Sequence, residues 1–171
     1  MKTPGAIASF ATLAAIACVT SGAPIAIEYK SAANLGSNAI DQNGTSFTVG
    51  GMSGIVRVQG NEYAAIQNNS NRIAKIIVVL GADGAITSAQ IKPGVGGGLT
   101  LSQSSDFEDI AFPGLAQNRV RISEESVPEI REYNFTTGAF VRSIPRPAIY
   151  ANRRSNFGLE SLSLNRTQAS M

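Results

Sequence analysis

The sequence predicts an all-β protein whose strands pair in antiparallel meanders. After the N-terminal segment, short runs rich in β-branched and apolar residues alternate with turn residues, and the longest run covers residues 73–80. Glycine is frequent, and residues 81–84 (GADG) and 137–138 (TG) are typical of hairpin turns. No segment after the first 23 residues has a long 3.6-residue apolar period, so we expect no long helix there.

The composition limits the classes of function. With 43% hydrophobic and 15% charged residues, the 171-residue chain has enough apolar material for one folded domain. A net charge of +2 is too small to indicate a nucleic acid or an anionic membrane as a partner. The chain has no histidine, which excludes Ser-His-Asp triads and His-ligated zinc. Any catalysis must therefore use carboxylates, hydroxyls, Lys, Arg or a metal bound through oxygen.

The N-terminus has the order of a secretory signal peptide. Within residues 1–23, Lys2 is followed by an uncharged run at 6–19 and then by small residues. This order predicts a secreted or periplasmic protein. A lipoprotein anchored through Cys18, the single cysteine, is one alternative, and a buried N-terminal helix is another. No other segment approaches the roughly 20 apolar residues of a membrane span.

Similar stretches recur along the rest of the chain. MSGI, FEDI and LESL begin at Met52, Phe107 and Leu159, which are 55 and 52 residues apart. The hairpin glycines Gly84 and Gly138 are 54 residues apart. A period of about 50 residues with about four strands is typical of a β-propeller blade, which buries its faces against neighbouring blades.

The repeat therefore predicts a partial β-propeller of about two blades plus the start of a third. We assign residues 24–49 to an N-terminal strand segment and linker, and residues 50–171 to the propeller domain. Because a ring takes about 4 to 8 blades, we expect the chain to be a fragment of a longer protein, cut inside its third repeat. The alternative is a small closed β-sandwich.

Acidic residues recur at one predicted rim of these units. In a blade, the start of the innermost strand and the end of the second strand are neighbours. Asp106 and Glu108 stand at the start of the first strand of the second unit, and Glu124 and Glu125 at the end of its second strand. Glu160 has in the third unit the place that Glu108 has in the second, and Asn68 and Asn69 have in the first unit the places of Glu124 and Glu125.

Converging carboxylates suit a hard cation such as Ca²⁺, which takes about 6 to 8 oxygen ligands. Crowding also raises the pKa of one carboxyl group, which suits a general acid or base. We therefore predict Asp106, Glu108, Glu125 and Glu160 as metal ligands, and Glu108, Glu124 and Glu160 as catalytic residues. The alternative is that these side chains are solvated strand ends or bind backbone N–H groups.

Four motifs resemble the phytase-like family, also described by the esterase-like activity of phytase. They are DFEDIAF at 106–112, ISEESVPEI at 122–130, GAFVRSIPRP at 138–147 and NFGLESL at 156–162. They are similar, in this order, to the family's Asp-x-Glu-Gly-Ile-Ala, Ser-x-Glu with a following Pro, G-x-x-x-R-x-(I/L)-P-x-P and Asn-x-Gly-(Phe/Leu)-Glu-x-Leu. GGMSGI at 50–55 resembles the family's opening Gly-Leu-Ser-Gly-Leu.

This resemblance implies a secreted or periplasmic propeller that hydrolyses phosphoric or carboxylic esters of small molecules. The alternative is a non-catalytic extracellular propeller that binds calcium, a glycan or a protein. Two departures matter. Asp109 replaces the Gly that usually follows the first Glu, and Asn68-Asn69 stand where Ser-Asp or Asp-Asp is common, which weakens a metal site in the first unit.

Overall fold

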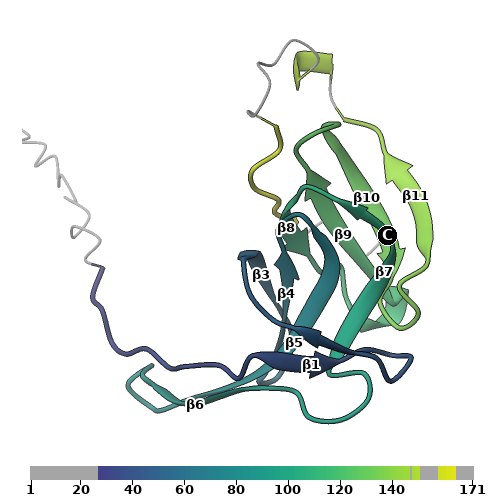
Figure 1. Cartoon of the computed structure of the whole chain (residues 1–171). Coiled ribbons are helices and arrows are strands. Elements are labelled where there is room, and N and C mark those ends of the chain that lie inside the picture. Colours follow the sequence, from purple (N-terminus) through teal and green to yellow (C-terminus); the bar gives the residue numbers. More distant parts are fainter. Residues whose placement is uncertain (1–26, 147, 151–157, 165–171) are drawn as a thin grey trace, which may run out of the picture.

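The computed structural model confirms the all-β class (Figure 1) and describes residues 27–146, 148–150 and 158–164. Apart from strands, these residues form two short 3₁₀ turns, η1 (Leu115–Gln117) and η2 (Ala148–Tyr150). The expected signal peptide, with Cys18, lies outside the described residues. In the part of the chain that the structure describes, no helix is long and apolar enough to cross a membrane.

The strands form three antiparallel sheets. The smallest contains β1 (Asn38–Ile40) and β2 (Ser46–Thr48). The second contains β3 (Met52–Gln59), β4 (Glu62–Gln67), β5 (Ser70–Leu80), β6 (Ile86–Ile91) and β7 (Gly98–Ser105). The third contains β8 (Phe107–Ala111), β9 (Arg119–Glu124), β10 (Glu129–Asn134) and β11 (Phe140–Ile144), paired in chain order as a simple meander.

The long strand β5 explains why the second sheet has five strands. One edge of β5 pairs with β4, while the other edge pairs with β7 along its first half and with β6 along its second half. β7 then leads through the single residue Asp106 into β8. The last strand of the five-stranded sheet thus leads directly into the first strand of the third sheet. We call strands β3 to β7 the first meander and strands β8 to β11 the second.

The two larger sheets share one hydrophobic core. Its buried members come from both: Ala64, Ile66, Ile73, Leu99, Leu101, Phe107, Ile110, Val120, Ile122, Tyr133 and Phe135. The rings of Phe107 and Tyr133 meet edge to face with centroids 6.1 Å apart. β8 contacts both β3 and β4, so the second meander packs its inner face on the first.

The first strands of the two larger sheets approach each other closely. A Cβ atom added at Gly54 of β3 would lie only 2.7 Å from the Cα atom of Asp109 in β8. One residue earlier, the Ser53 hydroxyl donates a hydrogen bond of 2.8 Å to the carbonyl oxygen of Phe107. The first strands of the two repeats therefore lie side by side, and only glycine fits at the crossing.

Strand register shows that the two meanders repeat one another. Met52 pairs with Gln67, and Phe107 pairs with Glu124. In both cases the register shifts immediately afterwards, so the second residue of each first strand lies in a bulge. The recurrence of a bulge at the same place supports the repeat that the sequence predicted.

The same geometry corrects the predicted alignment by one residue. The amide of Asn68 donates to Gly51, as the amide of Glu125 donates to Asp106. Glu125 therefore corresponds to Asn68, and the expectation that it corresponds to Asn69 is wrong. The offset between the repeats grows because β8 and β9 are joined by a longer connection, which contains η1, than the tight turn between β3 and β4.

The N-terminal hairpin β1–β2 covers part of the face of the five-stranded sheet that points away from the shared core. Ala39 and Val49 pack there on Ala74 of β5. The buried carboxylate of Asp41 accepts hydrogen bonds of 2.5 Å from the Thr100 hydroxyl and 3.1 Å from the Arg72 guanidinium. These contacts fix residues 38–49 to β5 and β7.

We predict that Gly54→Ala destabilises the protein by about 1–3 kcal/mol, because the added methyl group would overlap the backbone of β8. Urea unfolding followed by circular dichroism measures the change in the free energy of unfolding. Gly50→Ala is the matched control, since a Cβ atom at Gly50 meets nothing within 4 Å. Equal stability of the two variants would contradict the close approach of β3 and β8.

Candidate acidic metal site

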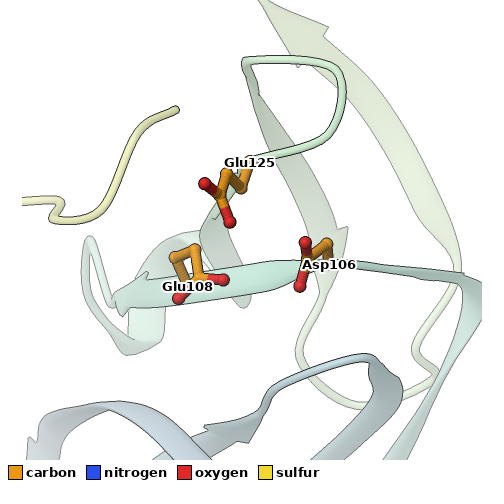
Figure 2. A group of neighbouring side chains, drawn as sticks. All are labelled: Asp106, Glu108 and Glu125. Atoms are coloured by element: carbon orange, nitrogen blue, oxygen red, sulfur yellow. The ribbon is translucent and has the colours of Figure 1, made fainter. Parts of the chain in front are cut away.

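Three carboxylates gather at the start of the second repeat. Asp106, Glu108 and Glu125 each offer one oxygen atom, and these three atoms lie within 4.8 Å of one another. Figure 2 shows Asp106 just before β8, Glu108 within β8, and Glu125 beside them, just beyond the end of β9. The structure thus brings together three of the four predicted metal ligands. We call these three residues the acidic group.

Backbone geometry places the acidic group. Glu108 occupies the bulge of β8, and a bulge turns a side chain out of the regular alternation of a strand. The amide of Glu125 donates a hydrogen bond of 3.0 Å to the carbonyl oxygen of Asp106, which ties the end of β9 to the start of β8. The two strand ends that carry the carboxylates are therefore held together by main-chain bonds.

The carboxylates of the acidic group repel one another. The pKa of Glu108 is raised, first by its partial burial and then by the negative charges of Asp106, Glu160 and Glu125. Among the residues that the structure describes, every ion pair of a lysine or arginine is formed with some other carboxylate. The site therefore holds negative charge that no described cation neutralises.

Glu160, the fourth predicted ligand, borders the acidic group. It is exposed and lies close enough to Glu108 for its charge to raise the pKa of that residue. Residues 158–164 run past β8 and the end of β9, where a Cβ atom at Gly158 would lie 2.6 Å from the Cα atom of Glu125. Glu160 is thus a neighbour of the three carboxylates.

The structure places Glu124, one of the predicted catalytic residues, away from the acidic group. Its side chain is 1% exposed. It accepts hydrogen bonds of 2.7 Å from the Ser105 hydroxyl and 3.1 Å from the Val127 amide, and it pairs with Arg131 at 3.2 Å. A catalytic role for Glu124 stays a prediction, but these contacts assign it to holding the turn between β9 and β10.

Gln67, the counterpart of Glu124 in the first repeat, supports this structural role. It is also buried, and its side-chain amide donates a hydrogen bond of 2.8 Å to the carbonyl oxygen of Gly50. The sequence could show that Glu124 and Glu125 point to opposite faces, but not which of them points inward. Side chains alternate between the faces of a strand, so when one of two adjacent residues points inward the other points outward.

The first repeat lacks the acidic group. Its positions that correspond to Asp106, Glu108 and Glu125 hold Gly51, Ser53 and Asn68. This agrees with the predicted weakness of a metal site in the first unit. Only the second of these two repeats supplies three carboxylates.

The acidic group offers the type of ligand that calcium prefers, but only some of the ligands that one calcium ion needs. Carboxylate oxygens are hard ligands, and three of them are within reach of one ion. Calcium takes about 6 to 8 oxygen atoms. Bidentate binding, Glu160, backbone carbonyl groups or water would have to supply the others.

Sequence reasoning did not find a second charged cluster, on the face of the third sheet that points away from the core. The carboxylate of Glu132, 5% exposed, pairs with Arg121 at 3.1 Å and with Arg142 at 3.3 Å. Burial acts to raise the pKa of Glu132, but the two arginines outweigh it and hold that pKa below its ordinary value. Because Glu132 is the cross-strand partner of both arginines, the cluster is a stabilising contact between β9, β10 and β11.

Comparison with known proteins identifies the family. A protein-family model described as "Phytase-like: Esterase-like activity of phytase" matches residues 48–170. The match contains the acidic group, Glu160 and all strands from β3 to β11. The chain therefore belongs to the phytase-like family, as its motifs indicated. The search of curated proteins and the search of solved structures gave no match.

We predict that Glu108→Gln raises the melting temperature at pH 7 when a chelator is present. The pKa of Glu108 is raised above its ordinary value of 4.5 in the folded protein, so the folded state binds this proton more tightly than the unfolded chain. Stability of the unsubstituted protein therefore falls as pH rises from 4.5 through the folded pKa, and the variant lacks this loss.

Melting curves of both proteins between about pH 4 and pH 8 measure this difference. The gain should disappear at the acidic end, where Glu108 is protonated in both states. Glu28→Gln, at an exposed position outside the site, is the control and should show no such dependence. A gain of equal size at every pH would refute the electrostatic explanation.

We also predict that Glu124→Gln lowers the free energy of unfolding by about 1–3 kcal/mol, because it leaves the guanidinium of Arg131 without its buried carboxylate. Calcium affinity should stay unchanged, since Glu124 is outside the acidic group. Urea unfolding and isothermal titration calorimetry measure the two quantities. A selective loss of calcium affinity at unchanged stability would place Glu124 in the site after all.

Proposed function

We propose that the chain forms part of a β-propeller, with β3, β8 and residues 158–164 side by side around one axis. The contact between the first two repeats recurs between the second and third. Gly54 lies against Asp109 and the amide of Ile110, and the carboxylate of Asp109 in turn accepts a hydrogen bond of 2.7 Å from the amide of Leu162. Asp109 corresponds to Gly54, and Leu162 to Ile110, at the spacing of the repeat.

The two contacts support stacking of neighbouring units by one repeated rotation. In a closed β-sandwich, successive sheets belong alternately to two layers. The pair of positions that joins the first repeat to the second would then not also join the second to the third. A ring of blades has this property because every blade contacts the next in the same way.

For the function, we propose a metal-assisted ester hydrolase that acts outside the cytoplasm, on phosphoric or carboxylic esters of small molecules. The observation that carries this proposal is the acidic group, whose three oxygen atoms lie within 4.8 Å of one another without a described cation to neutralise them. Membership in a family described by esterase-like activity supports the reaction class. The N-terminal leader pattern supports export.

Different residues of the site would bind the ion and transfer the proton. A bound calcium ion would offset the repulsion between the carboxylates and polarise the ester oxygen. Asp106 and Glu125 would hold the ion from the two adjoining strand ends. Glu108 has a raised pKa and Glu160 is exposed beside it, so these two residues are the candidates for transferring a proton to or from the attacking water.

A second candidate is a non-catalytic extracellular propeller in which calcium has a structural role. One observation favours it. Among the residues that the structure describes, no lysine or arginine pairs with the acidic group, whereas enzymes that transfer phosphoryl groups usually place cationic side chains at the substrate oxygens. Hydrolysis assays separate the two candidates.

We predict that the full chain binds calcium, and that Asp106→Asn weakens binding by about tenfold or more. Calorimetry with calcium measures affinity, and turnover of 4-nitrophenyl phosphate and 4-nitrophenyl acetate, with calcium or with chelator, measures hydrolysis. An enzyme should lose turnover on chelation and in Glu108→Gln, while the exposed control Glu28→Gln keeps both properties. Calcium binding without any turnover would favour the non-catalytic candidate, and absence of both would refute the proposal.

A further inference from the structure

Asp109 lies beside the acidic group but uses both of its oxygen atoms elsewhere. One carboxylate oxygen accepts a hydrogen bond of 2.8 Å from the amide of Ile110, the next residue of β8. The other accepts a hydrogen bond of 2.7 Å from the amide of Leu162, which is 53 residues further along the chain. The side chain therefore joins β8 to the segment 158–164.

The carboxylate of Asp109 occupies space that Gly54 leaves free. A Cβ atom at position 54 would lie 2.3 Å from the carboxylate oxygen that binds Ile110. The absence of a side chain at Gly54 thus lets Asp109 turn towards Leu162 while β3 and β8 remain in contact. One side chain lies between the first two repeats and reaches the beginning of the third.

Two anchors bracket Glu160. On its N-terminal side, Gly158 packs against the backbone of Glu125. On its C-terminal side, the amide of Leu162 is held by Asp109. In an extended chain, two residues span about 6–7 Å. Glu160 is therefore fixed within two residues of each anchor, between the contact with Glu125 and the contact with Asp109, the residue that follows Glu108.

We propose that Asp109 is a positioning residue that holds Glu160 in place as the fourth carboxylate of the calcium site. The role in calcium binding rests on the proposed function, whereas the bracket between Asp109 and Leu162 does not. Without the bracket, the segment that carries the exposed side chain of Glu160 would be free to move away from β8, because like charges repel one another. Asp109 thus adds an acidic ligand to the site without binding the ion itself.

The first experiment tests the bracket in calcium-free buffer. NMR of the full chain measures hydrogen exchange at the Leu162 amide and the Overhauser contacts between the side chains of Glu160 and Glu108. Asp109→Gly should speed exchange at Leu162 by about tenfold or more and abolish the contacts. Asp109→Asn keeps one acceptor oxygen and should have an intermediate effect, and it also serves if the glycine variant fails to fold.

Ser161→Ala is the matched control, because it changes an exposed side chain within the same segment. It should leave both NMR signals unchanged. Contacts between Glu160 and Glu108 that persist in folded Asp109→Gly would overturn the proposal, whether or not the protein binds calcium.

The second experiment is a double-mutant cycle on calcium affinity, measured by calorimetry. If Asp109 acts through Glu160, Asp109→Gly and Glu160→Gln each weaken binding by about tenfold, and the double variant is no weaker than either. Independent, multiplying effects would overturn the proposal and leave Asp109 a purely structural residue. If no variant and no unsubstituted protein binds calcium, the calcium site is refuted, and the NMR contacts alone then decide whether Asp109 positions Glu160.

Discussion

The close approach of first strands, β3 against β8 at Gly54, is the constraint on which both the core and the site depend. It lets β8 contact β3 and β4 together, so that Phe107 and Ile110 enter the core shared by the two sheets. It also sets the direction of the bulge that follows Phe107, because the inward side chain is committed to the core. Glu108 then projects away from the core, where Asp106 and the end of β9 meet. Packing and site geometry are two consequences of one contact.

The carboxylates of this protein divide into two classes by their partners. Three buried carboxylates each face an arginine: Asp41 with Arg72, Glu124 with Arg131 and Glu132 with Arg121. Removing such charges from water is tolerable only because the pairs are close and hydrogen-bonded. The acidic group has no such partner among the described residues, although its members are also partly buried. Among the described residues, the three buried carboxylates are thus neutralised by arginine, and the acidic group is not.

Much of this arrangement could be predicted from the sequence, and the failures have physical causes. The hairpin at residues 81–84, the antiparallel pairing and the recurring first strands depend on local turn chemistry and period, which are visible in one dimension. The alignment of Asn68 and the placement of Glu124 depend on bulges and on the long connection through η1, which add residues without a periodic signal. The acidic residues were found as a set because they crowd at strand ends. Which of them points inward was set by tertiary packing.

One position of the repeat shows how such a site can arise on a structural framework. In the first repeat this position is Ser53, whose hydroxyl donates to the carbonyl oxygen of Phe107 and so joins neighbouring strands. In the second repeat it is Glu108 and in the third Glu160. An ionised carboxylate only accepts hydrogen bonds, so it cannot donate to a carbonyl group as the hydroxyl does. The glutamates therefore cannot form the bond that Ser53 forms, and between β8 and residues 158–164 the joining hydrogen bond comes from Asp109, which accepts it from the amide of Leu162.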